Sequence, residues 1–343
     1  KTLFIVGAGA SAEYGFPTGT KLAASISEKL DIKYDDSGDK QISGDSKLWS
    51  QIHYTHRDEL RKYQNAAWLI RDGVHLSNSI DDFLNVHAAD QAVLKVGKAA
   101  IVRSILEAER ESTLFFDHSN AYNTLSFADV EGTWLTRLFR MLGRGVPPES
   151  AKNIFNNVGF VIFNYDRCIE HFFFNALKQF YKINDNQAAE VIHGLWICHP
   201  YGAVAPLMWM SQPGVDFGGN DHSPSPFLNL ADRIKTYTEQ IDDQSQIEEI
   251  RKKISEADKI IFLGFAFHDQ NLQLLKPKKA LQNSKEIFGT GFGMSDNDIK
   301  VTKEQLLGFF NNTIRRSMNG KMILENKNKC ADLFEHYAKS LPA

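Results

Sequence analysis

Polar side chains that could act on a bound ligand follow two apolar runs of the chain. Asn164 and Asp166 come just after the run 159–163, and His199 comes directly after the run 196–198. An amide, a carboxylate and an imidazole can orient a substrate, hydrogen-bond its hydroxyl groups and move a proton. Each also has a structural interpretation, because Asn and Asp are preferred helix caps and a histidine can be satisfied by the backbone. The residues alone leave both interpretations open.

Two histidines lie close together in this region, and the patterns around them differ. Pro200 disfavours helical geometry at His199, so His199 should end a strand and project from the edge of a sheet. His193 belongs to the segment 186–195, whose apolar residues have helical spacing, and it lies outside that apolar stripe. We therefore expect His199 at a site and His193 on the surface or at a helix end.

A glycine-rich segment, residues 7–11, follows the first apolar run. Glycines at this point let the backbone approach a phosphate, and the N-terminus of the next helix favours its charge. The dinucleotide-binding pattern is imperfect because Ala12 takes the place of the third glycine. The acidic residue expected about 20 positions later could be Asp31, Asp35 or Asp36. A tight turn between strand and helix is the alternative.

Small residues also follow two later apolar runs, 259–263 and 286–289. Gly264 and Phe265 follow the first of them, and Thr290 follows the second. Small residues that recur at strand ends suggest one extended ligand along the sheet edge.

The five apolar runs predict the fold. They occupy residues 2–6, 159–163, 196–198, 259–263 and 286–289, and helical or loop segments separate them. Alternating β and α segments predict an α/β protein with a doubly wound, parallel, Rossmann-like sheet. Ligands of such sheets bind at the carboxyl ends of the strands.

The chain divides into a core and added segments. We assign residues 1–30 and 151–302 to the Rossmann-like core, 31–150 to a helical insertion, and 303–343 to a largely helical C-terminal extension. Within the insertion, residues 31–46 read as a polar loop, and helices are expected at 56–71, at 80–110 with an interruption, and at 131–142.

Composition narrows the function classes. The 39 Lys and Arg against 42 Asp and Glu give a net charge of −3, so no global basic field indicates nucleic acid binding. Direct nucleic-acid contact through local clusters such as Arg137, Arg140 and Arg144 stays open. No apolar run approaches the length of a membrane span, and we expect a soluble cytoplasmic protein without membrane contact. The three cysteines form no CxxC pair, which argues against a zinc ribbon or a disulfide framework, and no metal site is expected.

The motifs taken in order resemble those of the sirtuin-like NAD-binding family. The resemblance rests on the glycine loop at 7–11 and 15–17, an Asn-x-Asp motif at 164–166, a catalytic-histidine segment at 199–202, and ribose- and adenine-side loops at 263–265 and 289–290. It covers residues 1–30 and 155–300, and the helical block adds only a family-like piece at 79–84.

Two departures separate the chain from the sirtuin deacylases. Those enzymes follow the glycine loop with a Pro-Asp-Phe-Arg-like segment, whereas this chain has Pro17-Thr18-Gly19-Thr20-Lys21. They also carry a four-cysteine zinc module, which three scattered cysteines cannot build. What remains looks like the prokaryotic anti-phage branch of the family, whose members hydrolyse NAD+ and deplete it in the infected cell.

This resemblance implies an NAD+ glycohydrolase that takes NAD+ as its substrate and uses no metal. It also implies a homo-oligomer and, by analogy with compact members of the branch, a HerA-like DNA-translocating ATPase as a possible partner. Two alternatives stay open: a nucleotide-binding sensor or scaffold subunit with little turnover, and an NAD-dependent protein deacylase or ADP-ribosyltransferase.

The resemblance further implies roles for individual residues. Asn164 would hydrogen-bond the ribose hydroxyls or the attacking water, Asp166 would hold the nicotinamide carboxamide, and His199 would act as the base. Ser11 would reach a pyrophosphate oxygen. The implied NAD+-binding residues are Gly7, Ala8, Gly9, Ser11, Phe16, Pro17, Asn164, Asp166, Gly264, Phe265, Asn271, Gly289 and Thr290. The helical block would cover the nicotinamide end or contact other proteins. Asp81 and Asp82 would line that cover or start a solvated helix.

Overall fold

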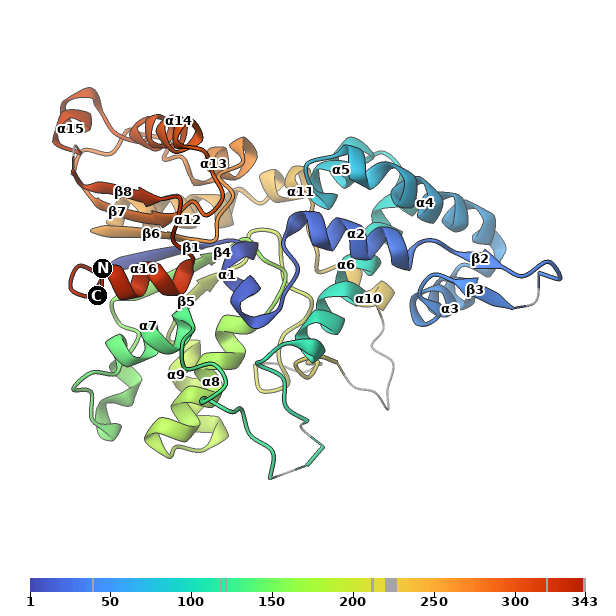
Figure 1. The fold of residues 1–343 in the computed structure, drawn as a ribbon, viewed down its shortest axis with the longest axis horizontal. Coiled ribbons are helices and arrows are strands. Elements are labelled where there is room, and N and C mark those ends of the chain that lie inside the picture. Colours follow the sequence, from blue (N-terminus) through green and yellow to red (C-terminus); the bar gives the residue numbers. More distant parts are fainter. Residues whose placement is uncertain are drawn as a thin grey trace.

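A six-stranded, all-parallel sheet forms the centre of the molecule (Figure 1). The computed structural model describes residues 1–38, 40–117, 119–120, 122–210, 213–219, 227–318 and 320–341. The strands are β1 (Thr2–Val6), β4 (Val158–Ile162), β5 (Trp196–Cys198), β6 (Lys259–Leu263), β7 (Glu286–Thr290) and β8 (Met322–Glu325). Their order across the sheet is β5-β4-β1-β6-β7-β8. The predicted α/β, Rossmann-like fold is therefore confirmed.

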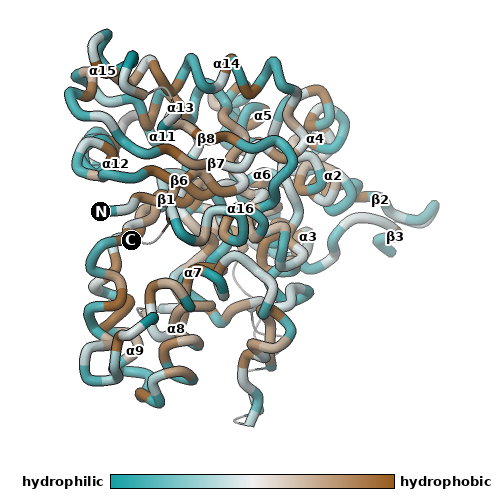
Figure 2. Tube along the Cα trace, turned by 60° about the vertical axis from the view of Figure 1, so that its left-hand side comes forward, coloured by the Kyte–Doolittle hydropathy of each residue, from teal (hydrophilic) through white to brown (hydrophobic). Residues whose placement is uncertain are grey.

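The strand order fixes where a ligand can bind. Counted along the chain, the sheet strands follow the doubly wound order 3-2-1-4-5-6, so the connections reverse direction between β1 and β6. Every residue of β1, β4 and β6 is buried, which explains why these strands appear in the sequence as continuous apolar runs. Figure 2 shows the hydrophobic residues concentrated along the strands and the hydrophilic residues at the periphery.

One strand was missed in the sequence. β8 lies within residues 303–343, which we expected to be largely helical, and it pairs with β7 from Met322 to Glu325. The other elements of that region are helical: the end of α14 (Asp296–Leu307), α15 (Asn312–Ser317) and α16 (Cys330–His336). The C-terminal segment therefore supplies the sixth strand of the core sheet as well as helices.

Helices flank the sheet and form the insertion. The flanking helices are α8 (Cys168–Tyr181), α9 (Asp185–His193), α12 (Gln244–Glu256) and α13 (Asp269–Leu275), with the short α1 (Ala8–Ser11), α10 (Phe227–Ala231) and α11 (Tyr237–Asp242) between strands. The insertion contains α3 (Ser46–Thr55), α4 (Leu60–Gly73), α5 (Ile80–Val86), α6 (Gln91–Glu111) and α7 (Trp134–Leu142). As expected, the long helical pattern is interrupted, and His193 is exposed at the end of α9.

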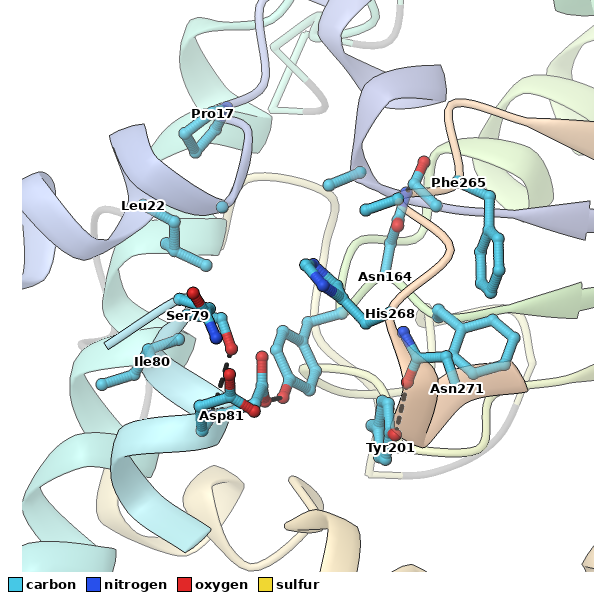
Figure 3. Close-up of a pocket in the computed structure, with 18 of the residues that line it drawn as sticks. Pro17, Leu22, Ser79, Ile80, Asp81, Asn164, Tyr201, Phe265, His268 and Asn271 are labelled. Atoms are coloured by element: carbon cyan, nitrogen blue, oxygen red, sulfur yellow. Dashed lines mark hydrogen bonds between the residues drawn. The ribbon is translucent and has the colours of Figure 1, made fainter. Parts of the chain in front are cut away.

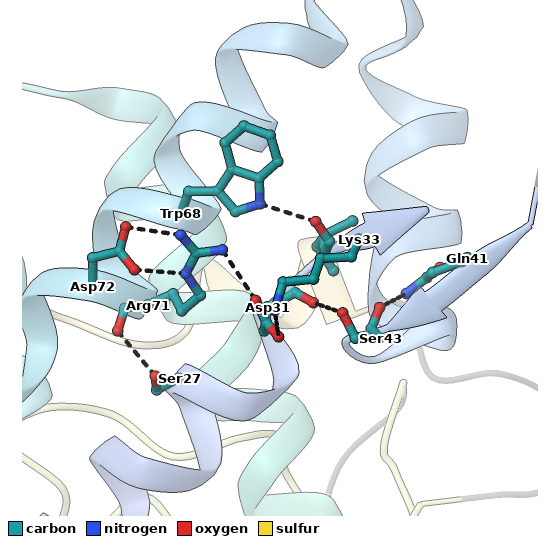
Figure 4. Close-up of polar contacts among 9 residues, drawn as sticks. Ser27, Asp31, Lys33, Gln41, Ser43, Trp68, Arg71 and Asp72 are labelled. Atoms are coloured by element: carbon teal, nitrogen blue, oxygen red, sulfur yellow. Dashed lines mark hydrogen bonds and ion pairs between the residues drawn. The ribbon is translucent and has the colours of Figure 1, made fainter. Parts of the chain in front are cut away.

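The polar segment 31–46 contains a small hairpin, β2 (Lys33–Tyr34) and β3 (Gln41–Ser43), rather than only a loop. Its base is held by polar contacts with α4 (Figure 4). The Arg71 guanidinium pairs with Asp31 at 3.0 Å, and the Trp68 indole N–H donates to the Ile32 carbonyl at 3.0 Å. The hydrogen bond from Lys33 is the largest cause that lowers the pKa of Asp31. Asp31 thus ties the base of the hairpin to α4, and Ser27 of α2 (Gly19–Lys29) donates to the Arg71 carbonyl at 2.9 Å.

The loops after β1 and β6 contact each other backbone to backbone. The Gly9 N–H donates to the Gly264 carbonyl at 3.0 Å, and Gly264 adopts a φ of +55°. A Cβ on Gly264 would lie 2.1 Å from the Ala10 nitrogen, and a Cβ on Gly7 would lie 2.5 Å from the Gly264 oxygen. These glycines are therefore required by the close approach of two loops at the switch point.

Replacing Gly264 by Ala should destabilise the fold. The new methyl group would meet backbone atoms that cannot move aside, and the left-handed φ adds strain, so we expect a loss of about 2 kcal/mol or more in the free energy of unfolding. Urea denaturation measures this loss. Gly132→Ala is the matched control, because a Cβ there meets nothing within 4 Å. Equal stability of the two variants would contradict the packing described here.

No helix in the described part of the chain is long and apolar enough to cross a membrane. Among the same residues, no group of three or more His, Cys, Asp or Glu side chains could hold a metal ion. All three cysteines are buried and free.

Candidate functional site

A cavity of about 170 Å³ lies at the carboxyl ends of β1, β4, β5 and β6 (Figure 3). The loop after each of these strands contributes to its wall, and α5 of the insertion closes the opposite side. The cavity is lined by the polar side chains of Asp81, Asn164, Tyr165, Tyr201, His268 and Asn271, among others. The cavity thus occupies the position that the strand order predicts for a ligand.

A second cavity, of about 670 Å³, adjoins the first. The two share Ala8, Gly19, Phe265 and Ala266, and the second continues past Gly264 to residues 290–294. Together they follow the edge of the sheet from β4 to β7. An elongated ligand could therefore cross the glycine loop and occupy both.

Most of the predicted binding residues line these cavities. Gly7, Ala8, Phe16, Pro17, Asn164, Asp166, Phe265 and Asn271 line the first, and Ala8, Gly9, Gly264, Phe265 and Thr290 line the second. Ser11, His199 and Gly289 line neither. Asp31, Asp35 and Asp36 also line neither cavity.

Asn164, Asp166 and Ser11 form one buried network. Asn164 Nδ2 donates to the Gly7 carbonyl at 3.1 Å and to Ser11 Oγ at 3.0 Å, and Ser11 Oγ donates to Asp166 Oδ2 at 2.8 Å. The other Asp166 oxygen accepts from the Cys168 N–H at the start of α8. Asp166 thus accepts a backbone hydrogen bond at the first turn of α8, although the N-cap residue is Arg167, and Ser11 is used within the protein.

The Asn164 amide retains one unused acceptor. Because the Gly7 carbonyl can only accept, Nδ2 must face it, which fixes the orientation of the amide. Asn164 Oδ1 is buried and has no hydrogen-bond partner among the described residues. A buried acceptor without a partner costs free energy, and a ligand hydroxyl or a water could satisfy it.

His199 is held behind the cavity wall. Its Nδ1 lies 3.1 Å from the Asn164 carbonyl oxygen and its Nε2 lies 2.8 Å from Glu170 Oε1. Burial acts to lower the pKa of His199, but the charge and hydrogen bond of Glu170 and the Asn164 carbonyl outweigh it, so the pKa is raised. Each ring nitrogen faces an oxygen acceptor, so the ring positions the loop of Asn164 in this conformation instead of offering a free base.

Tyr201 and Asn271 reach the cavity from neighbouring loops. The Tyr201 hydroxyl donates to Asn271 Oδ1 at 2.6 Å, and both residues line the cavity. The sequence analysis singled out the segment 199–202 for its histidine and missed the tyrosine two positions later. No feature of the local sequence shows which of the His199 and Tyr201 side chains faces the cavity, because their orientations depend on the packing of α8 against the loop.

The insertion contributes a carboxyl group. Ser79 caps α5 by accepting from the Asp82 N–H at 3.1 Å, and Asp81 accepts a hydrogen bond from the Tyr165 hydroxyl. Burial raises the pKa of Asp81 although the Tyr165 hydrogen bond opposes it. Asp81 and Asp82 both line the cavity, and both lie in the first turn of α5, where they are partly exposed.

A buried ion pair ties the insertion to the site loop. Arg167 directly follows the Asn-x-Asp motif, and its guanidinium binds the Glu109 carboxylate of α6, with a distance of 2.9 Å from Nε to Oε1. The two side chains are 1% and 0% exposed. Burial is the largest influence on the pKa of Glu109 and raises it, while the Arg167 charge lowers it. The guanidinium also donates to the carbonyls of Val215 and Asp216.

Comparison with known proteins adds no assignment. No model of a known protein family matches the chain, and no curated protein matches it either. The site must therefore be interpreted from its own geometry.

Arg167→Met should be strongly destabilising. The change leaves the Glu109 carboxylate buried without its cation, and we expect a loss of about 3–5 kcal/mol in the free energy of unfolding. The double variant Glu109→Leu, Arg167→Met removes both charges and should recover part of that loss. Chemical denaturation of the three proteins gives these values. A single variant as stable as the wild type would show that the pair does not join the insertion to the site.

The His199–Glu170 pair should make stability depend on pH. A histidine whose pKa is raised on folding stabilises the protein fully below about pH 6.5, its unfolded value, and this contribution fades as pH rises through the folded pKa. The wild type should therefore lose its advantage over His199→Gln with rising pH, by at most about 1.4 kcal/mol per pH unit. Urea titrations across this range measure the difference, and Glu170→Gln should remove the same pH dependence. A constant difference would refute the ion pair.

Proposed function

We propose that this chain binds NAD+ across the switch point between β1 and β6 and hydrolyses the bond between nicotinamide and ribose. One observation carries the proposal: residues from separate segments, chosen for their resemblance to the sirtuin-like motifs, line two adjoining cavities at the carboxyl edge of the sheet. The products would be nicotinamide and ADP-ribose.

The two cavities suit the two ends of a dinucleotide. The smaller one is mainly apolar but carries the polar side chains of Asn164, Tyr165 and Asn271, which suit a nicotinamide carboxamide and ribose hydroxyls. The larger one is bordered by Phe292, a residue that is 63% exposed, with the Lys329 ammonium 5.5 Å from the centre of its ring, and this ring would stack on adenine. The pyrophosphate would then pass over Ala8 and Phe265, the residues that both cavities share.

The glycine loop would contribute fewer phosphate contacts than its sequence suggests. The N–H groups of Gly7, Gly9 and Ala10 already donate to the carbonyls of Leu263, Gly264 and Gly7. These glycines mainly allow the backbones of the two loops to approach each other closely, and this approach shapes the space between the two cavities. Phosphate binding would depend on the remaining donors of the loop and on nearby cations such as Lys21, which lines the larger cavity.

Nicotinamide departure requires little acid catalysis from the enzyme. The C1′–N bond breaks through an oxocarbenium-like transition state, its electron pair goes to the pyridinium nitrogen, and nicotinamide leaves neutral. A water oxygen bonds to C1′ and loses one proton. The unused Oδ1 of Asn164 is a suitable acceptor for a ribose hydroxyl or for that water.

A second candidate is a nucleotide-binding subunit with little turnover. The contacts of His199 favour it, because both ring nitrogens are engaged and the ring lies outside the cavity. Such a protein would bind NAD+ or ADP-ribose without releasing nicotinamide. The family resemblance also supports a role in anti-phage defence in the cytoplasm, a homo-oligomer and a HerA-like ATPase partner, and these remain part of the proposal.

Asn164→Ala should nearly abolish nicotinamide release. The variant loses the acceptor in the cavity and the amide that joins the loops after β1 and β4, and we expect kcat to fall by about 10²-fold or more. Nicotinamide release is measured by chromatography, NAD+ affinity by calorimetry, and folding by circular dichroism. Asn186→Ala, at an exposed position of α9, is the control.

Two outcomes would count against the proposal. A wild-type chain that binds neither NAD+ nor ADP-ribose would refute the whole assignment. Binding of NAD+ without nicotinamide release, alone and with its candidate partner, would favour the second candidate.

A further inference from the structure

The loop after β6 brings an imidazole to the cavity. His268 precedes α13 and points into the space between Asn164 and the insertion helix α5 (Figure 3). Among the described residues that line this cavity, it is the only histidine. The sequence analysis did not assign it to the site. We propose that His268 is the general base that takes the proton from the attacking water, an inference that rests on the proposed hydrolysis of NAD+.

The other titratable groups of the cavity are poorly placed for this task. They come from α5 (Asp81 and Asp82), from the loop after β4 (Tyr165 and Asp166), and from the loop after β5 (Tyr201). Both Asp166 oxygens already accept hydrogen bonds within the protein, from Ser11 and from the Cys168 N–H.

The remaining groups are weaker candidates for chemical reasons. Asp81 is partly buried and already accepts the Tyr165 hydrogen bond, so its carboxyl group is engaged within the protein. Burial raises the pKa of both tyrosines, which therefore stay protonated at neutral pH. Asp82 also lines the cavity, but a carboxyl group is in general a weaker base than an imidazole. An imidazole is matched better to proton transfer at that pH.

The imidazole of His268 is available to a water molecule in the cavity. Its side chain makes no hydrogen bond with another described residue, and it is exposed to the cavity and to solvent. His199, by contrast, has both nitrogens engaged by Asn164 and Glu170. The unengaged imidazole is thus the one that a water in the cavity can reach.

The backbone before His268 is held in a costly conformation. Phe267 has a φ of +55°, which non-glycine residues rarely adopt. Its ring is buried and packs against Phe262 and Phe265, with ring centroids 5.2 Å apart in both pairs. This aromatic cluster stabilises the turn that directs His268 to the cavity. Strain of this kind is typical of functional loops.

The proton balance closes within the site. His268 begins neutral and accepts the water proton as the water oxygen bonds to C1′ and the C1′–N bond breaks. The imidazolium that forms faces the carboxyl group of Asp81 on the opposite wall, with which it interacts electrostatically. It then releases the proton to solvent, since the side chain is accessible.

The test compares His268→Gln, His199→Gln and the wild type. We expect His268→Gln to lower kcat for nicotinamide release by about 10²- to 10⁴-fold while the Kd for NAD+ changes by less than about threefold. The fall of the wild-type rate at acid pH, caused by protonation of the base, should disappear in this variant. Added imidazole should restore activity to His268→Ala. His193→Gln, on the exposed end of α9, is the control and should match the wild type.

The outcomes separate this inference from the proposed function. If the wild type hydrolyses NAD+ and His268→Gln keeps its kcat, the base assignment is wrong and the proposed function stands. The base assignment is also overturned if His268→Gln loses NAD+ affinity in proportion to its rate, or if imidazole restores nothing. A wild type that releases no nicotinamide overturns both.

Discussion

The close contact between the loops after β1 and β6 is the constraint on which the site depends. Gly264 in its left-handed conformation and the glycines at positions 7 and 9 let two backbones meet where side chains would clash. The Thr290 hydroxyl accepts from the Gly264 N–H at 2.8 Å and extends this contact to the end of β7. The two loops therefore meet at the switch point, and the two cavities beside them share Ala8 and Phe265 in their linings.

The insertion completes the smaller cavity from the other side. Two polar links join it to the loop after β4: the hydrogen bond between Tyr165 and Asp81, and the buried pair of Arg167 with Glu109. The first involves the middle residue of the Asn-x-Asp motif, and the second involves the residue that follows it. The motif therefore has a structural role that its sequence does not reveal, because it is the point where core and insertion are joined. Any change in the position of α5 or α6 would move Asn164 and the cavity wall together.

Much of the fold could be predicted because its strands are buried on both faces. β1, β4 and β6 are continuous apolar runs, and the carboxyl-end rule then brings Asn164 and the glycine loop to one edge. β8 was missed because it is a short edge strand in which only Leu324 is fully buried, so its pattern is weak. Asp31, one of the three acids considered for a ribose, pairs with Arg71 at the base of the β2–β3 hairpin.

The candidate site was harder to predict because its contacts join distant segments. Tyr165 meets Asp81 across 84 positions, and Glu170 reaches His199 only through the packing of α8. Sequence spacing places a histidine at the right strand end but cannot tell which side of the loop it faces. That distinction decides whether His199 or His268 meets a ligand, and it required coordinates.

Hydrogen exchange of the backbone with and without ADP-ribose tests the central claim most directly, because it reports where a nucleotide binds without requiring turnover. The account predicts slower exchange in the loops after β1, β4 and β6 and at the start of α5, with little change at the amino ends of the strands. Protection confined to other regions, or none at saturating ADP-ribose, would contradict a nucleotide site at the switch point.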